Sequence, residues 1–97
     1  MHPIAQTILT QLGGRRFLAM TGARDLVASE TSLAMRLPIG KARNLRIELA
    51  ADDTYTVKSL RWNRTNLQYG ITAIASGVYA DSLRDVVEGM TDLLVGL

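Results

Sequence analysis

The sequence contains no cysteine and a single histidine, His2, next to its start. The absence of cysteine excludes disulfides, thiolate nucleophiles and zinc–thiolate sites, and one terminal histidine leaves little for hydrolytic or metal chemistry. The two prolines, the 21% charged residues and the 47% hydrophobic residues are typical of a globular chain and not of a disordered one. We therefore expect one domain spanning residues 1–97 with a single core.

Long hydrophobic runs are also missing. No apolar run approaches the roughly 20 residues that cross a bilayer. The first 14 residues carry no charge, but polar residues interrupt them and they lack the basic start of a secretory signal. We therefore expect a cytoplasmic protein without a membrane partner.

Charge is distributed unevenly along the chain, although the net charge is only +2. Residues 1–80 hold ten Lys or Arg against five Asp or Glu, whereas residues 81–97 hold one Arg against four Asp or Glu. A basic body with an acidic tail favours steering of an anionic partner to one side of the molecule.

Two segments have the apolar periodicity of amphipathic helices. Ile4, Ile8 and Leu12 recur at four-residue steps over Pro3–Leu12, and two glycines end this pattern. A second apolar stripe begins at Tyr79 and continues through Leu83, Val86, Val87, Met90, Leu93 and Leu94. We predict a helix for each segment.

The segments between these helices have the patterns of short strands. They are Arg15–Thr21, Leu26–Ser29, Leu33–Leu37, Asn44–Ala50, Thr54–Trp62 and Leu67–Gly77. Residues 38–43 form a loop, and a shift of phase near Lys58 and Ser59 suggests a bulge. In the last strand, the alternating apolar residues from Leu67 to Ala75 share one face.

These elements predict an α+β fold with an antiparallel five- or six-stranded meander sheet. Connections this short favour pairing of consecutive strands. The N-terminal and C-terminal helices are expected to pack on one face of the sheet, which leaves the other face to solvent or to a partner.

Groups suited to catalysis are few. The adjacent carboxylates Asp52 and Asp53 fall in a hairpin turn, where Asp is favoured for its local hydrogen bonds. Asp81 and Asp85 lie one turn apart on a helix, for which a solvated face is the simpler account. The segment Gly13–Arg16 resembles a phosphate-binding turn but lacks the order and residues of a P-loop, so a helix stop explains it. We expect a binding protein without a cofactor or metal, and not an enzyme.

A set of basic residues on and beside the middle strands is the best candidate for a binding site. Alternation turns Arg36, Arg46 and Lys58 to the outer face of the sheet, where Trp62 shares the parity of Lys58. Glu48 lies on the same face and opposes this charge. The candidate partner-binding residues are Arg36, Lys41, Arg43, Arg46, Lys58, Arg61, Trp62 and Arg64.

Three kinds of partner fit such a face. Cations beside an aromatic ring suit nucleic acid, whose phosphates and bases they bind. Open strand edges and arginine anchors suit a host protein or ribonucleoprotein complex. A homodimer through the open face, which would bury Leu60 and Trp62, is a further alternative, and a solvated face is the simplest one.

Three motifs resemble a widespread group of small uncharacterised proteins of bacteriophages, prophages and other mobile elements. The first is Gln11-Leu12-Gly13-Gly14-x-Arg16-Phe17-x-x-Met20-Thr21-Gly22-Ala23-Arg24. The others are Asp53-Thr54-Tyr55-Thr56-Val57 and Gly77-Val78-Tyr79-Ala80-Asp81-Ser82-Leu83-Arg84-Asp85. The chain departs from the family pattern at Asp92, where the family has glycine, and around residues 61–66.

The resemblance implies a phage-type accessory protein in the cytoplasm of a host cell, with no catalytic residues to carry over. Small phage proteins of this kind often act by stoichiometric binding, as anti-CRISPR inhibitors of host defence complexes do. We therefore expect such an inhibitor, with a nucleic-acid-binding module and a self-associating structural phage protein as alternatives.

Overall fold

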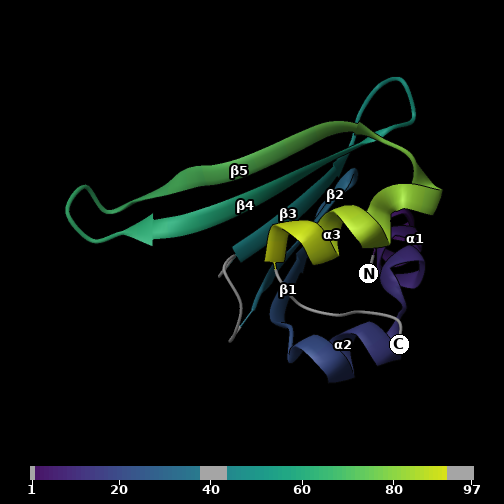
Figure 1. Ribbon diagram of the computed structural model, residues 1–97, viewed down its shortest axis with the longest axis horizontal. Coiled ribbons are helices and arrows are strands. Elements are labelled where there is room, and N and C mark those ends of the chain that lie inside the picture. The colour runs from purple at the N-terminus through teal and green to yellow at the C-terminus, as the bar shows by residue number, and fades with distance from the viewer. Residues whose placement is uncertain (1, 38–43, 92–97) are drawn as a thin grey trace.

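The computed structural model describes residues 2–37 and 44–91, and these residues contain one five-stranded sheet. The strands are β1 (Arg24–Ala28), β2 (Ser32–Arg36), β3 (Asn44–Leu49), β4 (Tyr55–Asn63) and β5 (Gln68–Val78). Each strand pairs antiparallel with the next, so the spatial order β1-β2-β3-β4-β5 equals the chain order (Figure 1). The predicted α+β fold with an antiparallel meander sheet is confirmed.

The helices gather on one side of this sheet (Figure 1). They are α1 (Pro3–Leu12), α2 (Arg15–Thr21), the 3-10 helix η1 (Ala80–Ser82) and α3 (Leu83–Thr91). Buried side chains of α1 and α3 join those of β2, β3 and β4 in one hydrophobic core. The predicted packing of N-terminal and C-terminal helices against the sheet is therefore confirmed. No helix in the described ranges is long and apolar enough to cross a membrane.

The core fixes the register of the central strands. Leu33, Ile47 and Val57 are partners across β2, β3 and β4, and all three are fully buried. Side chains alternate between the two faces of a strand, so the neighbouring residues point away from the helices. We call this second face, which no described helix covers, the open face. One row of partners across it is Ala34, Arg46, Lys58 and Ile74.

The prediction of a strand at Arg15–Thr21 is wrong, because this segment forms α2. Phe17 and Thr21 lie one helical turn apart and are buried, whereas Arg15 and Arg16 are exposed. The Thr21 hydroxyl donates a hydrogen bond to the Phe17 carbonyl (2.8 Å). Glycines with positive φ flank the helix at residues 14 and 22. A short apolar run fits a strand or a helix equally well in sequence, and burial of one side decided between them.

The predicted bulge is present, but its extra residue lies on β5. Ser59 pairs with Ala73 and Leu60 pairs with Ile71, so Thr72 has no partner in the β4–β5 ladder. The hydroxyls of Thr72 and Ser59 lie 2.6 Å apart and hydrogen-bond at this position. The bulge therefore bends β5 next to the edge of the sheet.

The predicted final helix begins later than its apolar stripe suggested. Tyr79 is 67% exposed and precedes η1, whereas Leu83 and Val87 of α3 are buried in the core. The chain needs η1 to turn from the end of β5 onto the helical layer, so Tyr79 falls outside the helix. The predicted loop at 38–43 and the stripe residues Leu93 and Leu94 lie outside the described residues.

We predict that Phe17→Ala lowers the free energy of unfolding by about 3–5 kcal/mol, because it leaves a cavity under a helix that the core holds in place. Denaturant unfolding followed by circular dichroism measures this change. Met20→Ala on the same helix is the matched control, because Met20 is partly exposed, and it should cost about 1 kcal/mol or less. Equal losses in both variants would contradict the packing of α2.

Candidate partner-binding surface

The structure brings three of the predicted site residues together on the open face. Arg46 and Lys58 are direct partners across β3 and β4, and Arg36 lies in the next row of β2, opposite Asn44. Arg36 and Arg46 are exposed and Lys58 is half-buried. The open face is therefore basic at its centre, as alternation in the sequence predicted.

Glu48 offsets part of this positive charge. Its Oε1 lies 2.7 Å from Arg46 Nε and 3.5 Å from Lys58 Nζ. Such partly exposed pairs contribute only about 0–1 kcal/mol to stability, but they hold both cations against the sheet. Among the described residues, no carboxylate lies within ion-pair distance of Arg36. Arg36 is thus the cation of this face that is most available to a ligand.

The remaining predicted residues lie at the far end of the sheet or outside the described part of the chain. Arg61 and Arg64 are exposed on the extension of the β4–β5 hairpin. Trp62 pairs with Tyr69 in the backbone ladder, and its side chain lies outside what the structure describes. Lys41 and Arg43 also lie outside the described residues. The five predicted residues whose side chains the structure describes therefore do not form one compact cluster: three lie together at the centre of the open face and two lie on the hairpin extension.

A pocket of about 340 Å³ opens on the same face. Strand residues from β1 to β5 line it: Asp25, Val27, Ala34, Met35, Arg36, Asn44, Leu45, Arg46, Leu60 and Tyr69. The volume lies within the range of sites that bind small ligands or single side chains. The open face is therefore concave at this position and not flat.

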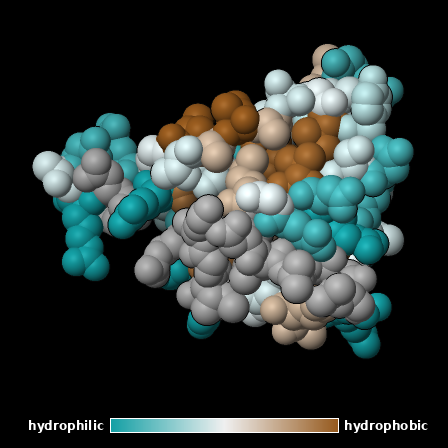
Figure 2. Space-filling model, viewed as in Figure 1, coloured by the Kyte–Doolittle hydropathy of each residue, from teal (hydrophilic) through white to brown (hydrophobic). Residues whose placement is uncertain are grey.

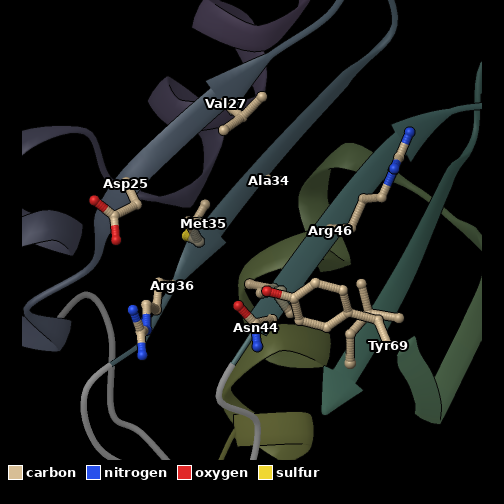
Figure 3. Close-up of a pocket in the computed structure, with 10 residues that line it drawn as sticks. Asp25, Val27, Ala34, Met35, Arg36, Asn44, Arg46 and Tyr69 are labelled. Carbon is tan, nitrogen blue, oxygen red and sulfur yellow. The ribbon is translucent and has the colours of Figure 1, made fainter. Parts of the chain in front are cut away.

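The walls of the pocket differ in chemistry. Figure 3 shows Asp25 and Arg36 at one side of the pocket and the Tyr69 ring at the other, beside Asn44. Val27, Ala34 and Leu60 supply apolar surface between these polar groups. Asp25 has a positive φ of 56°, a conformation that non-glycine residues adopt at a cost. The arrangement suits a side chain with an apolar body and a polar end.

Sequence reasoning missed the pocket residues that are not basic. The apolar residues from Leu67 to Ala75 were predicted to share one face, but the bulge at Thr72 divides them: Ile71 pairs with Leu60 on the open face, whereas Ala73 pairs with buried Ser59. Tyr69 and Ile71 are both more than half exposed. They lie where β5 passes the end of β3, since Ile71 pairs with Leu60 and Leu60 pairs with Asn44, the first residue of β3. Beyond this row, residues 61–70 form a two-stranded extension that we call the distal arm. The signal available in the sequence was that the segment of β5 is longer than that of β3, so that part of β5 extends past β3.

The carboxylates considered for catalysis have a structural role. The hydroxyl and the backbone N–H of Thr54 donate hydrogen bonds to Asp52 Oδ1, at 2.6 and 3.1 Å, and lower the pKa of that carboxyl. Asp53 adopts a positive φ of 66° in the same turn. No group of three or more His, Cys, Asp or Glu in the described part of the chain is placed to hold a metal ion. Asp52 therefore stabilises the β3–β4 turn.

We predict that Glu48→Gln strengthens binding of the protein to a single-stranded oligonucleotide, because it releases Arg46 and Lys58 from their shared carboxylate. Fluorescence anisotropy over a range of salt concentrations should show a salt slope steeper by about 0.7 for each freed cation that contacts a phosphate. Glu30→Gln is the matched control, because exposed Glu30 lies in the β1–β2 turn and the charge change is the same. An equal gain in the control would show that net charge alone, and not the Glu48 network, limits binding.

The comparisons with known proteins return no family model that matches the chain and no significant match among curated proteins or solved structures. The resemblance of three motifs to small phage proteins therefore stays a prediction.

Proposed function

We propose that this chain is a phage-type accessory protein that acts by stoichiometric binding of a host protein complex through its open face. The observation that carries this proposal is a sheet whose helices cover one face only, with a shaped pocket on the other. A sheet face that contacts only water needs no pocket of this kind. The motif resemblance supports the phage-type origin and, with it, a place of action in the host cytoplasm.

The charge of the open face favours a protein partner over nucleic acid. Arg24, Arg36, Arg46 and Lys58 share this surface with Glu48 and Asp25, so these six side chains sum to about +2, and Glu48 pairs with two of the four cations. Phosphate-binding surfaces gather many unopposed cations, because each phosphate contact releases counterions. Protein interfaces instead combine an apolar centre with arginine and tyrosine, as this pocket does.

Inhibition of a bacterial defence complex is the specific activity that we propose. A small protein that acts by binding must occupy a surface that its target needs, and defence complexes present acidic or RNA-bearing surfaces of that kind. Arg36 would pair with a carboxylate or phosphate of the target, and an apolar side chain of the target would enter between Leu60 and Tyr69.

We predict that Arg36→Glu lowers recovery of the target complex by at least about tenfold, because it reverses the charge of a residue that lines the pocket. The tagged protein is used to capture complexes from nuclease-treated host lysate, and recovery is quantified by mass spectrometry against the unchanged protein. Arg84→Glu is the matched control, because Arg84 is exposed on α3 and faces away from the sheet's open side. Full recovery with Arg36→Glu, or equal loss in both variants, would contradict binding through the open face.

A nucleic-acid-binding module is the second candidate, and the composition of the distal arm favours it. Residues 54–80 contain no Asp or Glu, and the arm presents exposed Arg61 and Arg64. Two-stranded ribbons fit the grooves of duplex nucleic acid, and neighbouring arginines bind its phosphates. In this candidate function the arm, and not the pocket, carries the affinity.

We predict for this second function that the double variant Arg61→Glu, Arg64→Glu weakens binding of a duplex oligonucleotide at least about tenfold and lowers the salt slope by about 1.8, which corresponds to two lost phosphate contacts. The exposed pair Arg15 and Arg16 on α2 provides a control with the same charge change. An affinity that does not depend on salt, or equal weakening by the α2 pair, would reject the arm as a nucleic-acid site.

A further inference from the structure

The outer edge of β5 is the longest unpaired strand edge in the described sheet. β5 has eleven residues and stands last in the strand order, with β4 on its only paired side. Its outer edge therefore presents unpaired backbone N–H and C=O groups, which are a template for another strand. In Figure 1, β5 runs along the top of the molecule, and no helix lies against the outer edge of its middle part.

The side chains of β5 do not protect this edge. The strand contains no charged residue and no proline. Tyr69, Ile71 and Ile74 are 56%, 56% and 58% exposed. Figure 2 shows hydrophobic residues gathered over the middle of β5, between the polar tip of the hairpin and the polar surface at the other end. Contiguous exposed apolar surface of this kind marks an interaction site more often than a solvated one.

The opposite edge of the sheet is protected in the usual ways. β1 has only five residues, its register with β2 shifts between Arg24 and Val27, and Asp25 adopts a positive φ. Short length, irregularity and charge are the features by which proteins prevent pairing at an edge. β5 has irregularities of its own, at Thr72 and between Ala75 and Val78, but residues 68–71 pair with β4 in regular register and carry no charge. The two edges of the sheet thus differ, and this segment of β5 is the part better suited to pairing.

Gly70 adds an independent observation in the middle of the exposed segment. Its φ is ordinary, and a Cβ at this position would meet no atom within 4 Å. The single chain therefore gives no steric or conformational reason for glycine, which weakens a strand interior and is favoured where another backbone approaches. Gly70 precedes the bulge at Thr72, so the backbone around it is regular.

We propose that β5 pairs antiparallel with β5 of a second copy of this chain. In the register that places Gly70 opposite Gly70 of the second copy, Tyr69 of each copy lies beside Ile71 of the other. Aromatic and β-branched side chains form favourable cross-strand pairs on one face of a sheet. A two-fold axis through Gly70 forms both pairs at once, which is the self-complementary arrangement of most homodimers.

Charge is the reason why a second copy is the fitting occupant. The seam, by which we mean the line where the two β5 edges meet, has no charged residue from either copy, so two copies meet without like-charge contacts. The nearest cation is Arg61, which pairs with Gly70 one strand away from the seam. With strands about 4.8 Å apart, the two Arg61 backbones are separated by roughly 14 Å, beyond the Debye length of about 10 Å at 0.1 M salt. An acidic or basic partner strand would gain nothing from this neutral edge.

Such a dimer joins two five-stranded sheets into one of ten strands. The two-fold axis is perpendicular to the sheet, so both open faces lie on one side and both helical layers on the other. Tyr69 lines the pocket and also lies next to the seam. The pockets of the two copies therefore lie on one continuous face of the dimer. This inference goes beyond the proposed function and does not depend on it.

The test is the mass of the purified protein in solution, measured by sedimentation and light scattering from micromolar to millimolar concentration. We expect the unchanged protein to reach twice the mass of one chain. Ile71→Lys should weaken self-association at least about tenfold, because it places two lysines, one from each copy, at the single β5–β5 interface. Val27→Lys is the matched control, because Val27 is a large exposed apolar residue on the opposite edge strand. The Val27→Lys variant should dimerise as the unchanged protein does, although it alters the lining of the pocket.

Backbone amide exchange provides a readout that does not depend on the variants. In a dimer through β5, the amides of residues 68–72 become protected as concentration rises, whereas those of β1 do not. A monomer at all concentrations, a dimer that Ile71→Lys leaves intact, or a dimer without concentration-dependent protection of β5 would each overturn the proposal. If Val27→Lys loses host-complex binding but still forms the dimer, the β5 edge and the pocket are separate surfaces, and the dimer stands without the proposed function.

Discussion

The register of β2, β3 and β4 determines which residues this protein presents to its surroundings. Leu33, Ile47 and Val57 pair across these strands and are buried beneath the helices. Because side chains alternate with a period of two, a slip of one residue would expose this row and place Arg46 and Lys58 in the core, where unpaired charges cost several kcal/mol. Burial of one row therefore fixes the composition of the open face.

The same constraint explains why the apolar residues of the distal arm and β5 remain exposed. The described part of β3 begins at Asn44, opposite Leu60, and beyond this row β4 and β5 have no further strand partner among the described residues. Two strands alone are marginally stable in water, so the arm depends on the sheet from which it extends. Tyr69 and Ile71 lie on the open face, where no helix of the described ranges covers them.

The sequence predicted those elements in which local pattern and burial agree. In β3, Leu45 and Ile47 alternate with Arg46, and the structure buries the first two and exposes the third. At α2 the pattern was too short to distinguish a helix from a strand, and the burial of Phe17 decided it. Tyr69 and Ile71 alternate as core residues do, but alternation predicts only a shared face. Whether a layer covers that face depends on the lengths of the neighbouring strands and on where the helices pack.

The candidate site was predictable to a similar degree. Alternation placed Arg36, Arg46 and Lys58 on one face and Glu48 beside them. The pairing of both cations with one carboxylate depends on the cross-strand register, which places Lys58 opposite Arg46. The pocket collects residues from strands that are distant in the chain, such as Asp25 of β1 and Tyr69 of β5. No spacing in the sequence records that proximity.

The contrast between the two edges of the sheet shows where the folded chain is incomplete on its own. A sequence that specifies one structure usually satisfies local pattern, burial and edge protection together, and departures from this consistency concentrate at functional positions. β1 has a protected edge, because it is short, irregular and charged, although none of its residues is fully buried. β5 reaches the core through Val78 and Ala75, but no described helix covers its segment with Tyr69 and Ile71, and no charge protects the edge of that segment. The same chain that blocks pairing at one edge leaves the other open over its least charged strand, and this asymmetry is what an edge covered by a second copy requires.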